Sequence, residues 1–254
     1  MADNPPIALV TGGSHRIGRA IVEDLARNGW AVAIHYNRSG NDAEALAASI
    51  RAAGGRAAAV GADLADPDAV AGLVNAAEAI LGKLRLLVNN ASMFVADTGG
   101  ALDSALFDRQ MQVNLRAPLF LTEAFARALP EDGEGNVVHL IDQSVWKPTP
   151  KNFSYQLAKA ALWTATQMHA QALAPRVRVN AIAPGPTFKH TRQSDAEFAA
   201  RVDSILLKRG PDPAEFGRTI RFLVENRSIT GQMIGLDGGQ HLAWQTPDVS
   251  GPDD

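Results

Sequence analysis

The chain reads IALVTGGSHRIG from Ile7 to Gly18, a short apolar run followed by a glycine-rich turn. The apolar run has the length of a buried strand, and a helical pattern begins at Ile17. The glycines suit any tight turn from a strand to a helix, which is the purely structural interpretation. In a first βα unit, however, backbone N–H groups and the positive helix end can also hold the pyrophosphate of a dinucleotide. We favour this second interpretation because of where the turn lies.

Apolar runs and Ala-rich helical segments alternate along the rest of the chain. The apolar runs are short throughout, as buried parallel strands are. The strands we expect are Ile7–Thr11, Ala31–Tyr36, Ala57–Ala62, Leu86–Asn89, Asn136–Ile141, Arg178–Ile182 and Gln232–Leu236. The helices we expect are Ile17–Asn28, Ala43–Ala53, Pro67–Leu81, Ser104–Ala128, Tyr155–Ala172 and Pro213–Glu225. This alternation predicts an α/β fold with a doubly wound, seven-stranded parallel sheet and helices on both faces.

Length and composition fit one compact soluble domain. The chain has 254 residues, 46% of them hydrophobic, and a formal net charge of -3. An acidic balance without clustered Lys and Arg argues against nucleic acid or an anionic membrane as a partner, so small molecules are expected. There are no cysteines, which excludes disulfides and thiolate chemistry and fits a cytoplasmic location. The 6 histidines show no spacing typical of metal ligands, so we expect no metal site.

The sequence also predicts how the domain is bounded. We assign residues 1–245 to the domain and expect the polar segment 246–254 to form a flexible tail. The first residues are acidic and lack an apolar core, so we expect no signal peptide, and no later apolar run approaches the ~20 residues of a membrane span. Between 186 and 210 the pattern weakens to a polar excursion with one helical run, Ala196–Leu207. Such an excursion is typical of a loop that covers a substrate.

The residues after the second expected strand indicate which cofactor is used. An NAD-specific site normally presents a carboxylate to the ribose 2′-hydroxyl there, whereas this chain reads HYNRS from His35 to Ser39. Arg38, with Asn37 and Ser39 beside it, offers hydrogen-bond donors to a 2′-phosphate. We therefore expect NADPH and NADP+ as the cofactor pair. The alternative is that Arg38 is an ordinary solvated charge.

Tyr155 and Lys159 form a candidate acid–base pair. They lie four residues apart, hence on one helix face about a turn from each other. A free tyrosine has a pKa near ~10, and a nearby cation favours the phenolate, which predicts a pKa for Tyr155 closer to neutral. The same spacing also occurs as an ordinary surface pair, so it is not specific alone.

Several motifs occur together in a characteristic order: the glycine turn, Asn89-Asn90-Ala91, Asn114, Tyr155 with Lys159, and Pro184-Gly185. In order and approximate spacing the chain resembles the short-chain dehydrogenase/reductases over nearly its whole length. This resemblance implies a single-domain Rossmann fold and a nicotinamide cofactor. It implies that Tyr155 donates a proton, that Lys159 contacts the nicotinamide ribose, and that Asn114 supports a proton-relay water. Members of the family are commonly tetramers, so a homotetramer is expected, and the small residues Ala158, Ala160 and Ala161 permit close helix packing.

Two departures from the general family pattern narrow the resemblance. Arg16 stands where the family usually has the middle glycine of its turn, and Asp142 stands where a serine usually helps to hold a substrate carbonyl. Both departures are shared with the pteridine reductases and the dihydromonapterin reductase-like proteins. The segment from Asn90 to Phe94 also resembles theirs, in which the aromatic ring stacks on the pterin.

These residues suit the chemistry of a pterin, which is flat, rich in donors and acceptors, and reduced at a C=N bond. Phe94 offers a platform, Arg16 a cation, and Asp142 with Tyr155 a source of protons. We expect reduction of a dihydropterin, of the dihydromonapterin, dihydrobiopterin-like or dihydrofolate type, with the side chain of the substrate left open. Each of the three residues also has a bland interpretation: Phe94 as core packing, Arg16 as a pyrophosphate ligand only, and Asp142 as a loop cap.

Two rival functions remain at this stage. Ser144 lies two residues from Asp142 and would point the same way if the strand continued through both, so a ketoreductase acting on a carbonyl through Ser144 and Tyr155 is the alternative. A protein that senses NADP(H) without turnover is a third possibility, which the presence of Tyr155 and Lys159 argues against.

The predicted site residues fall into three groups. The catalytic residues are Asp142, Tyr155, Lys159 and Asn114, and the residues that contact the substrate are Arg16, Ser92, Phe94, Asp142 and Tyr155. The residues that bind the cofactor are Gly12, Ser14, His15, Arg16, Ile17, Tyr36, Asn37, Arg38, Ser39, Asp63, Leu64, Asn90, Ala91, Ser92, Tyr155, Lys159, Pro184, Gly185 and Thr187.

Overall fold

The computed structural model describes residues 5–189 and 193–244, so the predicted tail 246–254 lies outside the described residues. The strands are β1 Ile7–Val10, β2 Ala31–Tyr36, β3 Ala57–Gly61, β4 Leu86–Asn89, β5 Gly135–Leu140, β6 Val177–Pro184 and β7 Met233–Leu236. The helices are α1 Arg16–Arg27, α2 Gly40–Ala52, α3 Pro67–Leu81, α4 Ser104–Met111, α5 Ala117–Ala128, α6 Phe153–Ala172, α7 Asp195–Asp203 and α8 Pro213–Glu225.

All seven strands form one parallel sheet in the order β3-β2-β1-β4-β5-β6-β7. The strand order reverses between β1 and β4, where Leu9 of β1 pairs with Ala33 of β2 on one side and with Leu87 of β4 on the other. Open sheets of this kind bind ligands at the carboxyl ends of the strands beside such a reversal. The α/β fold class expected from the sequence is confirmed.

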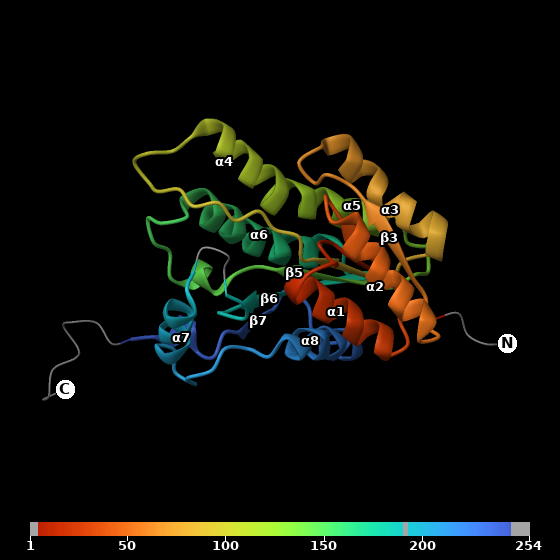
Figure 1. Cartoon of the computed structure of the whole chain (residues 1–254). Helices are drawn as coiled ribbons and strands as arrows, with labels where there is room; N and C mark the ends of the chain where they lie inside the picture. The colour runs from red at the N-terminus through yellow and green to blue at the C-terminus, as the bar shows by residue number, and fades with distance from the viewer. Residues whose placement is uncertain (1–4, 190–192, 245–254) are drawn as a thin grey trace, which may run out of the picture.

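Helices cover both faces of the sheet, and Figure 1 shows α3, α4, α5 and α6 on one face with α1 and α8 on the other. One apolar core lies under α3 and α5 and includes Leu73, Leu121 and Phe125. A second lies under α1, α2 and α8 and includes Ile21, Leu46 and Phe216. These two cores fix the strands from both sides and leave the carboxyl ends of the strands open to carry a site.

The helix expected over Ser104–Ala128 is interrupted. Between α4 and α5 the residues Gln112–Arg116 form a π-helical turn, which contains the fully buried Asn114. Such single turns within α-helices often lie at functional sites. The short helix expected at Ala196–Leu207 is α7, which begins one residue earlier, where Ser194 and Glu197 form a capping box, and ends at Asp203.

Candidate functional site

A cleft of about 1030 Å³ opens at the carboxyl ends of the strands. It is lined by the β1–α1 turn, the loop after β2, the segment after β4, the end of β5 and the start of α6. Every residue that the sequence predicts for the site lines this cleft except Asn114, which lies buried behind it. The structure therefore brings together residues that are up to about 170 positions apart in the chain.

The glycine turn is held against the sheet by a buried histidine. The backbone N–H of Gly12 donates to Nδ1 of His35 at 3.0 Å, and Nε2 of His35 lies 3.1 Å from the carbonyl oxygen of Ala62. Burial lowers the pKa of His35 to about 4, so the ring is neutral and Nε2 carries the hydrogen. Gly12 has a φ of +61°, and a Cβ at Gly18 would lie 2.1 Å from the oxygen of Gly12. Both positions therefore need glycine.

Arg16 adopts a left-handed backbone conformation, with a φ of +51°. Its guanidinium donates to the carbonyl oxygens of Phe188 and Lys189 at 3.2 and 3.1 Å and lies 5.3 Å from the centre of the Phe188 ring. A glycine would adopt this φ without strain, so the arginine is present at a conformational cost. The hydrogen bonds of its guanidinium connect the first turn of α1 to the segment that follows β6.

The loop after β2 presents a cation to the cleft. The side chains around it are paired: Ser14 with Ser39 at 2.8 Å, and Asn37 with Asp63 at 3.3 Å. Arg38 is exposed in the cleft and has no ion pair or side-chain hydrogen bond with any residue that the structure describes. Asp63 follows β3, and its Oδ1 accepts from Asn37 and from the N–H of Ala65.

The segment after β4 is fixed by Asn114 from the π-helical turn. Oδ1 of Asn114 accepts from Oγ of Ser92 and from the N–H of Met93, both at 2.9 Å, and Nδ2 donates to the oxygen of Met93 at 2.8 Å. These bonds orient the residues that precede Phe94. Asn114 thus supports the wall of the cleft, while its expected part in a proton-relay water remains a prediction.

Phe94 lies against Tyr155 at the centre of the cleft. The two rings meet edge to face, with centroids 4.8 Å apart and an interplanar angle of 86°. Phe94 is 46% exposed, which is unusual for a phenylalanine that only packs a core. The expectation that it offers a face to a flat ligand fits this position better than the interpretation as core packing.

Asp142 and Tyr155 form the central polar pair. The hydroxyl of Tyr155 donates to Oδ2 of Asp142 at 3.0 Å, and Oδ1 accepts the N–H of Ser144 at 2.8 Å. Burial first, and then the neighbouring carboxylate, raise the pKa of Tyr155 well above its ordinary value. The expectation that Lys159 brings this pKa closer to neutral is therefore wrong here, because burial and the nearby carboxylate raise the pKa instead.

Lys159 is buried beneath Tyr155. Its side chain donates to the oxygen of Leu140 at 2.7 Å, and Nζ lies 5.8 Å from the centre of the Tyr155 ring. Burial lowers the pKa of Lys159 to about 8, although the charge of Asp142 acts against this shift. The lysine is thus a cation with an easily lost proton, next to the tyrosine.

Ser144 does not continue the strand. β5 ends at Leu140, and Gln143–Trp146 form a short 3-10 helix, η2, whose first N–H groups are capped by Asp142. Oγ of Ser144 is buried and has no hydrogen-bond partner among the described residues. The condition under which Asp142 and Ser144 would point the same way is therefore not met.

Among the residues that line the cleft but were not predicted as site residues are Arg109 of α4, Phe188 after β6, and Arg201 of α7. Phe188 and Arg201 fall within the excursion 186–210 that was expected to cover a substrate, but none of the three belongs to a motif, so only the folded arrangement shows that they reach the cleft. Pro184 and Gly185 were expected, and Gly185 packs so closely on Asp237 that a Cβ would lie 2.5 Å from the Cα of Asp237.

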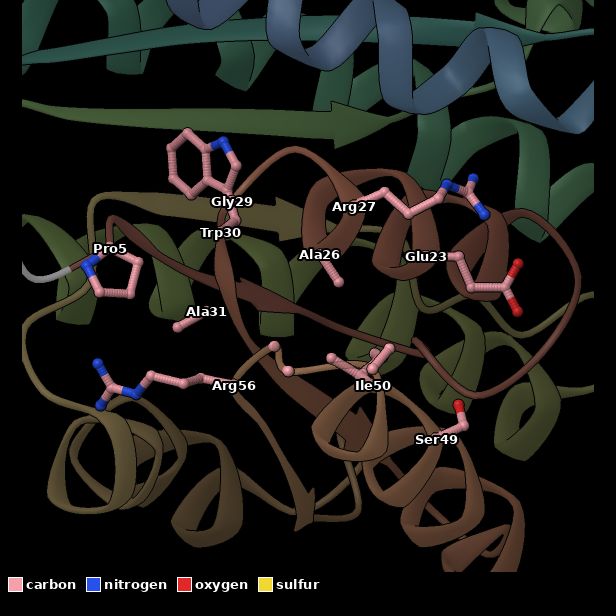
Figure 2. A pocket seen from close by; sticks show the side chains of 13 residues that line it. Pro5, Glu23, Ala26, Arg27, Gly29, Trp30, Ala31, Ser49, Ile50 and Arg56 are labelled. Atoms are coloured by element: carbon pink, nitrogen blue, oxygen red, sulfur yellow. The ribbon is translucent and has the colours of Figure 1, made fainter.

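A second hollow, of about 690 Å³, lies at the opposite end of the sheet. Figure 2 shows the charged side chains of Arg27 and Arg56 on different sides of it. Binding sites usually gather a few convergent polar groups, and this hollow does not. Within residues 5–189 and 193–244, no three His, Asp or Glu side chains form a group that could hold a metal ion, and no helix is long and apolar enough to cross a membrane.

Comparison with known proteins agrees with this geometry. The family model for short chain dehydrogenases matches residues 6–199. The chain is 30% identical to a dihydromonapterin reductase of Klebsiella pneumoniae, over 95% of this chain and 100% of the relative. It is 35% identical to a 3-oxoacyl acyl-carrier-protein reductase of Synechocystis, over 92% of this chain and 96% of the relative.

A solved structure is more similar still. The FolM alternative dihydrofolate reductase 1 of Brucella suis, in complex with NADP, is 57% identical to this chain. The two structures superpose with a TM-score of 0.94, over 98% of this chain and 100% of the other.

Proposed function

The chain belongs to the short-chain dehydrogenase family, and on this basis we propose that it is an NADPH-dependent reductase that converts a dihydropterin to its tetrahydro form. The observation that carries the proposal is the pair of Asp142 and Tyr155, joined at 3.0 Å and faced by the half-exposed ring of Phe94. A carboxylate next to a tyrosine suits a heterocycle with ring N–H and amino groups, because these groups donate to it.

The residues of the cleft fit NADP(H). Gly12 and Gly18 let the turn pack tightly at the start of α1, where backbone N–H groups and the helix dipole favour an anion such as a pyrophosphate. Arg38, which pairs with no described residue, would offer its guanidinium to the 2′-phosphate, and Lys159 would hold the nicotinamide ribose. The bound cofactor supplies the hydride that reduces the C=N bond.

The protein residues then provide the proton that the ring nitrogen needs. The raised pKa of Tyr155 keeps its proton on the phenol, and the hydrogen bond to Oδ2 of Asp142 gives that proton a route toward a ligand held by the carboxylate. The Lys159 ammonium, buried beneath the ring, stabilises the phenolate that remains after transfer. Phe94 orients the flat substrate by contact with its face.

Carbonyl reduction is the second candidate function, and the 3-oxoacyl acyl-carrier-protein reductase of Synechocystis is the relative that favours it. It would need Ser144 as a neutral donor to the carbonyl oxygen. The buried Oγ of Ser144 and the position of that residue in η2 do not support it.

We also propose that the protein works in the cytoplasm as a homotetramer. The absence of cysteine from the sequence is consistent with a reducing compartment. The outer faces of α5 and α6 expose Phe120, Leu157 and Met168, which are 49%, 44% and 62% accessible, and large apolar side chains in such number suit a contact between subunits. Light scattering coupled to size-exclusion chromatography tests the tetramer.

Steady-state consumption of NADPH tests the activity. The purified protein is assayed with dihydromonapterin, dihydrobiopterin and dihydrofolate, and with a panel of ketones that includes a 3-oxoacyl thioester. We expect turnover with at least one dihydropterin at a kcat/KM well above that of any ketone. Turnover of ketones alone, or of no substrate, would overturn the proposal.

A further inference from the structure

The cleft is cationic although the whole chain is acidic. Among the described residues, two carboxylates line it, Asp63 and Asp142, against five cations, which are Arg16, Arg38, Arg109, Lys159 and Arg201. The chain as a whole carries 24 Lys and Arg against 27 Asp and Glu. Positive charge is therefore concentrated at the site, which indicates a need to bind anions there.

Three of the five cations are accounted for by the proposed cofactor or by protein contacts. Arg38 suits the 2′-phosphate, and Lys159 lies beneath Tyr155 and donates to Leu140. Arg16 starts α1 beside the expected pyrophosphate and binds the carbonyl oxygens of Phe188 and Lys189. Arg109 and Arg201 remain without such an explanation.

Arg109 and Arg201 have no ion pair or side-chain hydrogen bond with any residue in the described part of the chain, and both are exposed at the cleft. Arg109 and Arg201 both belong to helices that side-chain hydrogen bonds hold in place. Gln110, next to Arg109 in α4, donates to the oxygen of Val95 at 3.1 Å and so ties that helix to the Phe94 segment. Arg201 belongs to the last turn of α7, whose first turn is closed by the capping box.

Both arginines lie toward the reacting end of the cleft. Arg109 and Val113 line it one helical turn apart, and Val113 precedes the Asn114 that holds the Phe94 segment. The positive charge of Arg201 acts on Tyr155, where it lowers the pKa against the larger effects of burial and Asp142. A substrate held on Phe94 beside Tyr155 would thus extend its side chain toward two guanidinium groups that pair with no described residue.

We propose that Arg109 and Arg201 bind carboxylates in the side chain of the substrate, so that the enzyme prefers a dihydropterin with an acidic side chain of the folate type to one with an uncharged hydroxylated side chain. This inference rests on the proposed function and specifies its substrate. A guanidinium group offers two parallel donors that match a carboxylate. Two arginines on separate helices suit the two carboxylates of a glutamyl group.

The test compares two substrates with the same pterin ring, dihydrofolate and dihydromonapterin. The variants are Arg109→Gln, Arg201→Gln and the double variant, and the matched control is Arg218→Gln, an exposed arginine of α8 on the other side of the molecule. The readout is the ratio of kcat/KM for dihydrofolate to that for dihydromonapterin. NADPH binding, measured by fluorescence, shows that each variant is folded.

We expect each single variant to lower this ratio about fivefold, mainly through a higher KM for dihydrofolate, as the loss of one exposed charge pair of about 1 kcal/mol would give. The double variant should lower it further, and the control should leave it unchanged. Added salt should reduce the preference of the unmodified enzyme for dihydrofolate and have less effect in the double variant.

Three results would overturn the inference. One is an equal loss with both substrates, which would make the arginines general to catalysis or folding. Another is an unchanged ratio. The third requires a further substrate, a dihydropterin with a phosphate ester in its side chain: an effect of the variants confined to that substrate would mean that the arginines bind phosphate. In each case the unmodified enzyme still reduces a dihydropterin, whereas failure of the proposed function would appear as no dihydropterin turnover at all.

Discussion

The carboxylate of Asp142 bridges two neighbours, since Oδ2 accepts the Tyr155 hydroxyl at 3.0 Å while Oδ1 caps η2 at the N–H of Ser144. The same side chain therefore positions the tyrosine and fixes the short helix that carries Ser144. This arrangement favours Asp142 over Ser144 as the polar partner of the Tyr155 hydroxyl. Asp142 reaches the tyrosine, and Ser144 contributes its backbone.

Asp142→Ala should reduce kcat/KM for dihydropterin reduction by about a hundredfold or more, because the acid–base partner of Tyr155 is lost. Ser144→Ala should keep most of the activity, and Tyr155→Phe should be strongly impaired. Steady-state kinetics on one dihydropterin and one ketone measure these effects, with NADPH affinity as the control for folding. Retained dihydropterin turnover in Asp142→Ala would contradict the role given to Asp142, whereas ketone turnover that is lost in Ser144→Ala and kept in Asp142→Ala would favour the carbonyl reductase instead.

Arg38→Ala should remove much of the preference for NADPH over NADH. The variant loses a charge-assisted contact to the 2′-phosphate, which predicts roughly a tenfold or larger weakening of NADPH binding with little change for NADH. Titration of each dinucleotide gives the two dissociation constants. Arg27→Ala, at the opposite end of the sheet, is the matched control. Unchanged discrimination in Arg38→Ala would show that another residue holds the phosphate.

Phe94→Ala should weaken pterin binding by about 1–3 kcal/mol, since a planar ligand loses a large aromatic contact. NADPH binding should change little. Isothermal titration calorimetry measures the two affinities separately. A pterin inhibitor is titrated into the enzyme–NADP+ complex, and NADPH is titrated into the free enzyme. Equal losses for both ligands would mean that the ring mainly supports the structure around Tyr155.

The stability of the protein should fall as the pH drops from 6.5 toward 4. Burial lowers the pKa of His35 to about 4 and that of His139 to about 3, so both are neutral when folded. The unfolded chain binds a proton at each near pH 6.5, so their stabilising effect is complete above that pH and is lost below it. The loss is on the order of 3 kcal/mol for each histidine across this window.

Urea unfolding at several pH values tests this prediction. In His139→Gln the slope of unfolding free energy against pH should be shallower between 6.5 and 4 than in the unmodified protein, because one buried titrating group is gone. His15→Gln is the control, since His15 is exposed beside Asp42. Equal slopes in all three proteins would contradict the assignment of His139 as a neutral buried group.

Much of the fold could be predicted because parallel strands and their helices leave local patterns. The first strand, the glycine turn and the alternation that follows give the order of elements without any tertiary information. The position of Arg38 could be predicted in the same way, because Arg38 follows the end of β2 and the ends of the parallel strands line the cleft. The structure confirms these expectations because each depends on neighbours in the sequence.

The parts that could not be predicted depend on contacts across the sheet. The pKa of Tyr155 was expected to fall because Lys159 is visible four residues away, whereas the burial and the approach of Asp142 that raise it arise only on folding. Arg109 carries no local signal, and Arg201 is marked only by the excursion 186–210 that contains it, because both reach the cleft from the sides of helices. The end of β5 at Leu140, which turns Ser144 away from the expected direction, follows from capping by Asp142.

The π-helical turn at Gln112–Arg116 has a consequence for how this site tolerates insertions and deletions. A π turn holds one residue more than the α turn it replaces, so the helix that follows is rotated by about 100° from the phase that α4 would otherwise impose. Deleting one residue from this turn would restore a single continuous helix and return α5 to that phase. The fold would be kept, with one continuous long helix in place of α4 and α5. Asn114 would, however, lose its hydrogen bonds to Ser92 and Met93, so the geometry of the site depends on a single residue in the length of this turn.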